Sequence, residues 1–149
     1  MGKGTKRTIL VDGEGTPLAG TLAGADVHEI RLAQPTLDRV YVPQRRGRPR
    51  TRVGGLGADK AYDARWFRHA MRQRGIQTAI PLREYQHRRM RGRPPAVDAT
   101  LYGKRWVVER TFSWLQNFRR LTNRWDRYLS AYHGFFTVAC IILCARRLA

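Results

Sequence analysis

Residues 53–81, VGGLGADKAYDARWFRHAMRQRGIQTAIP, decide the fold class. The short apolar stretch before Asp59 is typical of a strand, and residues 76–80 form a second strand that a proline stops. Between them we expect a helix over residues 63–74, with Asp63 as its N-cap and a glycine just past its end. Strand, helix and strand in succession predict an α/β fold, with Asp59 at the end of a central strand.

The chain before this unit predicts a hairpin followed by a helix. Residues 8–11 and 17–23 are apolar and flank the turn sequence Asp-Gly-Glu-Gly at residues 12–15. Residues 27–41 place apolar side chains near one helical face. Pro35 lies inside that pattern, so we expect it to kink or interrupt the helix.

The chain after this unit predicts two helices. Asp98 can cap a long helix that reaches about Leu121, and a final helix is expected over residues 128–147. The second half of the final helix is apolar nearly all round, which predicts that it is buried. Its longest apolar run, 134–145, has twelve residues. A bilayer needs roughly 20, so no membrane span is predicted.

The charge is the unusual feature of the composition. The 149 residues include 29 Lys plus Arg against 11 Asp plus Glu, which leaves a formal net charge of +18. The length predicts one domain over residues 1–149, and the charge predicts an anionic partner. Two Arg-rich loops are expected, at 43–52 and 82–97, and for the first both phosphate contact and simple solubility remain open. If the chemistry is phosphoryl transfer on DNA, the loops would hold the DNA backbone. The arginines of the second loop that we expect to contact DNA are Arg88, Arg89, Arg91 and Arg93.

The two cysteines are too few for a disulfide framework, which favours a cytoplasmic protein. Their spacing predicts core thiols rather than metal ligands, since no further Cys or His pair completes a site. Among the tryptophans, Trp106 and Trp125 are the better candidates for stacking on unpaired bases, whereas Trp114 belongs to a core face.

Four polar residues of the helix expected over 98–121 fall on one side. At about 100° per residue, Tyr102, Arg105, Glu109 and Gln116 lie within about 60° of one another. One interpretation is a solvated face with an Arg105–Glu109 pair at i, i+4. The other is that Glu109 and the strand-end Asp59 are hard oxygen ligands, which hold Mg²⁺ or Mn²⁺ for phosphoryl transfer.

The spacing of these residues is also that of a known family. The run 59–63, followed by Tyr102-(2)-Arg105-(3)-Glu109-(6)-Gln116, resembles the C-terminal catalytic portion of bacterial insertion-sequence DDE transposases. The signature of that family is Tyr-(2)-Arg-(3)-Glu-(6)-Lys. Three of its four positions match with the correct spacing, and a glutamine occupies the place of the lysine.

The resemblance implies a ribonuclease-H-like fold in which three acidic residues bind two divalent metal ions. By position, Asp59 would be the second acid and Glu109 the third. Tyr102 and Arg105 would support the site and contact DNA at the transposon end. Gln116 would lie where the family has a cation, so the DNA contact there lacks that charge.

In the family, the first acid lies on a strand upstream of the hairpin. In this sequence the predicted hairpin begins almost at Met1. We therefore expect a partial fold that lacks this strand and the N-terminal DNA-binding region. Asp12 is the nearest substitute, but its setting is that of a hairpin turn. Two explanations of the missing upstream part remain open. The chain is either a decayed, truncated element or a second reading frame whose upstream half is supplied by frameshifting.

The function implied is DNA transposition, with metal-dependent cutting at element ends and joining of the freed 3′-hydroxyl to target DNA. The partners implied are double-stranded DNA and either a second copy of the chain or an upstream transposase half. The alternative is a catalytically inactive DNA-binding remnant or a regulator of an intact transposase. The Arg-rich loops also suggest an RNA-binding protein, but that leaves the Tyr-Arg-Glu spacing unexplained.

Overall fold

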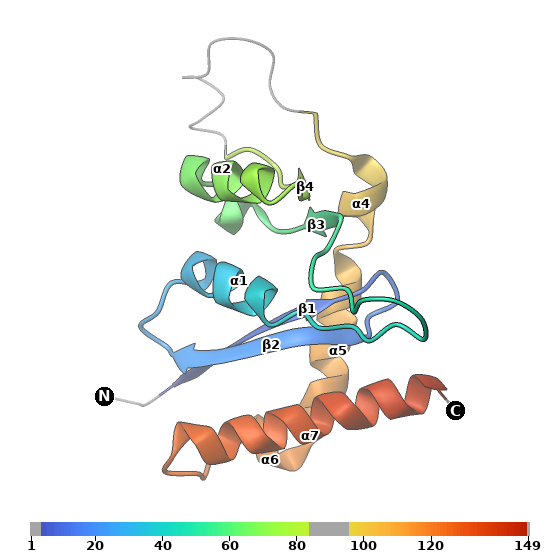
Figure 1. The fold of residues 1–149 in the computed structure, drawn as a ribbon. Helices are drawn as coiled ribbons and strands as arrows, with labels where there is room; N and C mark the ends of the chain where they lie inside the picture. The colour runs from blue at the N-terminus through green and yellow to red at the C-terminus, as the bar shows by residue number, and fades with distance from the viewer. Residues whose placement is uncertain (1–3, 84–95, 149) are drawn as a thin grey trace. The chain divides into compact units, whose positions relative to one another are not determined.

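The computed structural model describes residues 4–83 and 96–148, and the chain divides into two compact units (Figure 1). Unit 1 comprises Met1–Arg52 and Trp106–Ala149, and unit 2 comprises Val53–Arg105. Each unit contains helices together with a small sheet, which confirms the α/β class. The signature predicted from the sequence therefore starts in one unit and ends in the other.

The sheet of unit 1 is the predicted hairpin. β1 (Thr5–Val11) pairs antiparallel with β2 (Pro17–Gly24), with a register irregularity at the end of β1. The turn is closed by Asp12, whose Oδ1 accepts hydrogen bonds from the backbone amides of Glu14 (2.9 Å) and Thr16 (2.8 Å). An aspartate that bonds the amides two and four residues ahead is a common way to stabilise such a turn.

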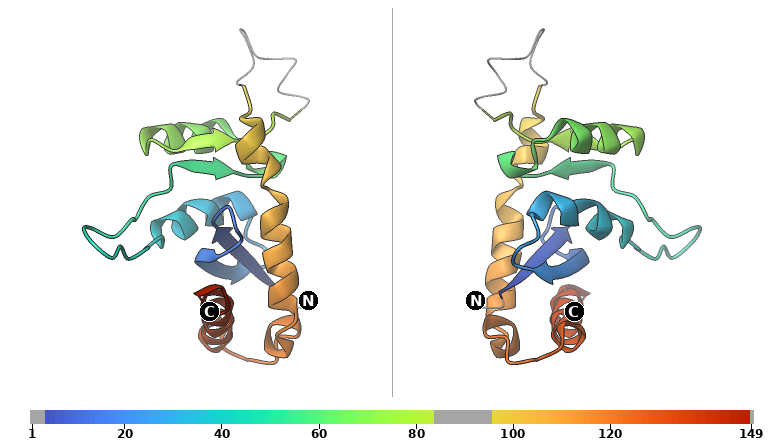
Figure 2. Two further views of the ribbon diagram at one scale, coloured as in Figure 1. Left: turned by 90° about the vertical axis from the view of Figure 1, so that its right-hand side faces the viewer. Right: turned by 90° about the vertical axis from the view of Figure 1, so that its left-hand side faces the viewer.

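The helix that follows the hairpin continues through its proline. α1 (Glu29–Asp38) contains Pro35, so of the two predicted effects, a kink or an interruption, the interruption is wrong. The buried hydroxyl of Thr36 donates to the carbonyl of Leu32 (2.7 Å) and lies 2.9 Å from the hydroxyl of Thr21 on β2. Tertiary packing on the hairpin thus outweighs the local preference of proline. α1 covers one side of the hairpin (Figures 1 and 2).

The long helix predicted over 98–121 is divided into three. α4 (Ala99–Gly103), α5 (Trp106–Gln116) and α6 (Arg119–Thr122) replace it. A glycine, which disfavours helix, ends α4 before a turn, and Phe118 adopts extended backbone between α5 and α6. Residues on α4 and on α5 therefore do not share one continuous helical face.

The cap predicted for this segment is confirmed. Oδ1 of Asp98 accepts from the amides of Thr100 (2.9 Å) and Leu101 (3.0 Å), which are otherwise unpaired at the start of α4. The prediction of the helix start was therefore right, while the prediction of its length was wrong.

The last helix, α7 (Leu129–Leu148), lies on the other side of the hairpin from α1 (Figures 1 and 2). Its buried side chains join a core formed with β1, α5 and α6. The prediction that the second half is buried all round is wrong, because Val138 and Ile141 are 53% and 59% exposed. The buried residues of the core cluster are Ile9, Leu115, Leu121, Tyr132, Phe136, Ala139 and Leu143.

By length and composition alone, α7 is apolar enough to cross a membrane. A core helix passes the same test, and α7 buries one face against the hairpin and α6. Cys140 packs against this core, and burial raises the pKa of its thiol to about 12, with a further contribution from Cys144. Cys140 is thus a protonated core thiol at neutral pH.

Unit 2 confirms the predicted strand–helix–strand unit. β3 (Gly55–Gly57) pairs in parallel with β4 (Gln77–Ala79), and the chain between them forms the 3₁₀ helix η1 (Lys60–Tyr62) and α2 (Arg65–Gln73). Gly75, with a φ of 68°, follows α2 as predicted. Both strands are shorter than expected. Within the described residues each has one neighbour, so β3 is not shown to be a central strand.

The first of the two basic loops lies in unit 1. Residues 43–52 contain neither helix nor strand, apart from an isolated bridge in which Val42 and Arg50 exchange two backbone hydrogen bonds of 2.8 Å. The second loop falls mostly outside the described residues. The arginines predicted to contact DNA there, Arg88, Arg89, Arg91 and Arg93, all lie outside them.

The contact between the hairpin and α7 gives a test of the fold. A Cβ on Gly20 would overlap the ring of the buried Phe136, whose Cζ would lie 2.8 Å away. We expect Gly20→Ala to lower the free energy of unfolding by about 1–3 kcal/mol, measured in urea. Gly134 is exposed on α7 with nothing near its missing Cβ. Gly134→Ala should raise stability by about 0.5–1 kcal/mol. Equal effects of the two variants would contradict this packing.

Candidate functional site

Asp59 follows β3 and begins η1. Its Oδ1 accepts a hydrogen bond from the amide of Lys60 (2.8 Å), which makes it the N-cap of that short helix. Its side chain is 53% exposed. Asp63, and not Asp59, was predicted to be the N-cap of the helix that follows β3, over residues 63–74. In the structure the N-cap of α2 is Ala64, with no side-chain hydrogen bond, so that assignment is wrong.

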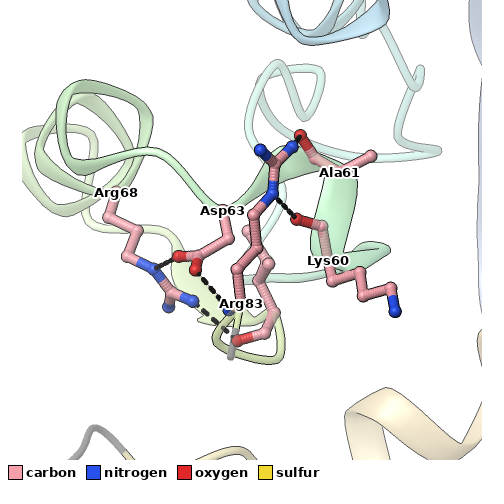
Figure 3. A network of polar contacts seen from close by, with 6 residues as sticks. Lys60, Ala61, Asp63, Arg68 and Arg83 are labelled. Carbon is pink, nitrogen blue, oxygen red and sulfur yellow. Dashed lines mark hydrogen bonds and ion pairs between the residues drawn. The ribbon is translucent and has the colours of Figure 1, made fainter. Parts of the chain in front are cut away.

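Asp63 is instead the centre of a buried polar network (Figure 3). Its side chain is 1% exposed. One carboxylate oxygen accepts from Nε of Arg68 and the other from the backbone amide of Arg83, both at 2.8 Å. A buried carboxylate requires such partners, because an unpaired charge away from water is very costly. This need explains why Asp63 faces inward rather than toward the helix amides.

The two arginines extend the network into the neighbouring backbone (Figure 3). Arg83 donates to the carbonyls of Lys60 and Ala61, both at 3.0 Å. Arg68 donates to the carbonyl of Ile80 at 2.7 Å. The network therefore ties η1 to α2 and to the segment after β4. It fixes the backbone that directly follows the candidate metal ligand.

A glycine on β3 allows α4 to approach the same place. A Cβ on Gly57 would lie 3.0 Å from the backbone carbonyl oxygen of Leu101. A Cβ on Gly55 would lie 2.9 Å from Cδ2 of the same leucine. Strand glycines often mark such close backbone approaches. The absence of side chains at Gly55 and Gly57 thus lets α4 pack closely against β3.

The close approach brings three predicted site residues together. Nη1 of Arg105 lies 3.5 Å from Oδ2 of Asp59. The guanidinium carbon of Arg105 lies 5.7 Å from the ring centroid of Tyr102. Both members of the ion pair are exposed to solvent, so the pair contributes little stability. Its main effect is to place a positive charge beside the carboxylate that ends β3.

The remaining signature residues lie on α5 of unit 1, where Glu109 and Gln116 are exposed. α5 is attached to the hairpin by Thr111, whose buried hydroxyl donates to the carbonyl of Gly15 at 2.8 Å. The predicted single face of Tyr102, Arg105, Glu109 and Gln116 is therefore not formed by one helix. Two of its members belong to each unit.

An arginine next to Glu109 strengthens the attachment of α5. Arg110 donates to the carbonyl of Glu14 at 2.6 Å. Its guanidinium carbon lies 4.8 Å from the ring centroid of Trp106 and 4.9 Å from that of Trp114. Cation–π contacts of this kind contribute about 0.5–2 kcal/mol each. The expected core role of Trp114 is confirmed, since it packs against the core cluster.

The carboxylates suit a divalent metal by their chemistry. Asp59 and Glu109 are exposed hard oxygen ligands of the kind that Mg²⁺ prefers. Within residues 4–83 and 96–148, no three His, Cys, Asp or Glu side chains form a group that could hold a metal ion. Partial burial acts to raise the pKa of Asp12, but the amides of Thr16 and Glu14, the hydroxyl of Thr16 and the charge of Arg147 together lower it. Asp12 is thus an ionised turn residue.

Sequence reasoning missed the residues that support the site. Arg68 and Arg83 are 5 and 20 residues from Asp63, and no local pattern connects them. The glycines of β3 did carry a signal, because small residues in a strand indicate that another backbone comes close.

The network around Asp63 gives a direct test. We expect Asp63→Ala to lower the free energy of unfolding by about 3–5 kcal/mol, because it leaves the charge of the largely buried Arg68 without its carboxylate partner. Asp26→Ala, at an exposed position, should change it by less than about 0.5 kcal/mol. Chemical denaturation measures both. Similar small losses for the two variants would show that the network is not structural.

The close contact between α4 and β3 gives a second test. Gly57→Ala should loosen α4, since its added methyl group meets the backbone of Leu101. Hydrogen exchange of the α4 amides is expected to accelerate on the order of tenfold, for a local cost of about 1–2 kcal/mol. Gly54→Ala is the matched control, because nothing lies within 4 Å of its missing Cβ. Unchanged exchange in Gly57→Ala would refute the close approach.

Comparison with known proteins places this arrangement in a family. Residues 2–144 match the transposase DDE domain family. Over 142 residues the chain is 37% identical to a putative transposase for insertion sequence element IS402 of Burkholderia cepacia, covering 95% of this chain and 63% of that protein. Over 94 residues it is 32% identical to a putative transposase for insertion sequence element IS6501 of Brucella ovis, covering 63% of this chain and 69% of that protein.

No solved structure matches the chain. The chain spans less than two thirds of the IS402 transposase, although almost all of the chain takes part in that match. The match over residues 2–144 includes the spaced residues Tyr102, Arg105 and Glu109 on which the resemblance was based. The chain therefore belongs to the transposase DDE domain family, as the spacing of its signature predicted.

Proposed function

We propose that this chain supplies two acids of a DDE transposase catalytic centre, Asp59 and Glu109, and takes part in cutting and joining DNA at insertion-sequence ends. The observation that carries the proposal is the cluster of Asp59, Tyr102 and Arg105 in unit 2. Family membership supports a role in DNA transposition. The βαβ unit is compatible with a ribonuclease-H-like fold, which we propose for the two units acting as one catalytic domain.

The proposed metal ligands are Asp59 and Glu109. Bound Mg²⁺ or Mn²⁺ would stabilise the charge that develops on the phosphate and assist formation of the attacking hydroxide. Arg105 neutralises Asp59 in the absence of the ion and keeps its carboxylate beside α4. The buried Asp63 network holds the backbone behind it, so Asp59 needs little reorganisation to accept a ligand.

DNA is the proposed polymer partner, as double-stranded transposon ends and target. The net charge of +18 supports contact with many phosphates. We propose that Tyr102 and Arg105 contact the transposon end, together with the arginines of the second basic loop. Gln116 would contribute hydrogen bonds there without a charge. The further DNA-contacting residues proposed are Arg88, Arg89, Arg91 and Arg93.

Assembly and location complete the proposal. Two element ends have to be joined to one target, which supports a homodimer or assembly with an upstream transposase half. A protein that acts on bacterial DNA would work in the cytoplasm at the nucleoid. The alternative is an inactive DNA-binding remnant or regulator. That alternative is favoured by the lack of a group of three metal-binding side chains within the described parts of the chain.

Nicking of supercoiled plasmid DNA tests this function. If this chain completes an active site alone, the purified chain should nick the plasmid with Mg²⁺ or Mn²⁺, and chelation of the metal should abolish nicking. Asp59→Asn and Glu109→Gln should each reduce the rate by at least about 100-fold, because each removes a proposed metal ligand.

The matched controls are Asp26→Asn and Glu29→Gln, two exposed carboxylates outside the proposed site, which should leave the rate unchanged. Nicking that survives in Asp59→Asn and Glu109→Gln would contradict the assignment of the acids. DNA binding without any metal-dependent nicking would mean that this chain alone is inactive and is either a fragment that needs its upstream half or a DNA-binding remnant.

A further inference from the structure

A second basic site lies in unit 1, on residues that follow Gln116, the last position of the transposase signature. The segment between α5 and α7, residues 119–128, has the sequence RRLTNRWDRY. A cavity of about 650 Å³ opens on it. Pockets of about 300–1,000 Å³ are the usual size for small ligands. The residues that line it are Arg119, Arg120, Thr122, Asn123 and Trp125.

The lining of this pocket is positively charged. Two arginines take part in it and no carboxylate does. The guanidinium carbon of Arg120 lies 5.1 Å from the ring centroid of Phe135. Nη1 of Arg120 lies 4.0 Å from Oδ1 of Asp126. Arg119 is exposed on the first turn of α6. A guanidinium group can bind phosphate oxygens through two parallel, charge-assisted hydrogen bonds, which are stronger than neutral ones.

Trp125 adds a flat apolar surface at the same place. Its side chain is 80% exposed, compared with 54% for Trp106 and 49% for Trp66. Exposed tryptophans in a basic groove are typical stacking surfaces for nucleic-acid bases. Duplex DNA hides the faces of its bases in the helical stack, so only an unpaired base can use such a surface fully.

We propose that this pocket binds an unpaired nucleotide of single-stranded DNA, with a phosphate on Arg119 and Arg120 and the base stacked on Trp125. The inference rests on the proposed function, because strand cleavage creates DNA ends at which bases can separate. It goes beyond that function by assigning a DNA site to residues outside the metal-binding signature.

Binding of labelled oligothymidine to the full chain tests the proposal, in chelator so that no cleavage occurs. We expect Trp125→Leu to weaken this binding by about tenfold, since stacking of one base is lost. Duplex DNA of equal length should bind the variant as it binds the wild type. Arg119→Gln should weaken oligothymidine binding and lower its dependence on salt.

The matched controls are Trp66→Leu and Arg31→Gln, which change an exposed tryptophan and an exposed arginine outside the pocket. Both should bind oligothymidine as the wild type does. The proposal would be overturned by unchanged binding in Trp125→Leu, by an equal loss for duplex DNA, or by tighter wild-type binding of oligouridine. The last result would assign the pocket to RNA.

Plasmid nicking separates this proposal from the catalytic one. If the wild type nicks but Trp125→Leu binds oligothymidine normally, only the pocket assignment fails. If the wild type does not nick but Trp125→Leu loses oligothymidine binding, the pocket assignment stands and catalysis by this chain alone is excluded.

Discussion

The buried carboxylate of Asp63 is the interaction on which unit 2 depends. It accepts from Arg68 on α2 and from the backbone of Arg83 after β4, and both arginines then bond further backbone carbonyls. β3 and β4 have three residues each, and a two-stranded sheet of this size is at best marginally stable by itself. The polar network around Asp63 adds hydrogen bonds that hold η1, α2 and the segment after β4 together. Asp59, four residues earlier, can therefore remain exposed and still be held in one place.

Close packing and a buried hydrogen bond support the rest of the candidate site. α4 rests on β3 because Gly57 leaves room for its backbone, and this brings Arg105 within 3.5 Å of Asp59. In unit 1, the hydroxyl of Thr111 fastens α5, which carries Glu109, to the hairpin turn. Each unit thus presents one proposed acid on a backbone fixed by buried contacts. The turn that ends α4 lies at the division between the units.

Local patterns predicted what local physics determines. The hairpin, the strand–helix–strand unit and the cap at Asp98 follow from turn residues, apolar runs and capping chemistry, and all three are confirmed. The errors concern distant partners. Asp63 resembles an N-cap unless Arg68 and the remote backbone of Arg83 are known. Pro35 resembles a helix breaker unless the packing on the hairpin is known. The roles of Asp59 and Glu109 stay predictions from the family signature.

The central proposal is that Asp59 and Glu109 are both ligands of divalent metal. Iron-directed backbone cleavage tests it most directly: Fe²⁺ replaces Mg²⁺, ascorbate and peroxide generate radicals at the ion, and mass spectrometry locates the cuts. We predict cuts near both residues, suppressed by excess Mg²⁺, with the cuts near Asp59 lost in Asp59→Asn and those near Glu109 lost in Glu109→Gln. Absence of cuts near either residue, or cuts that persist in the matching variant, would contradict metal binding by that residue.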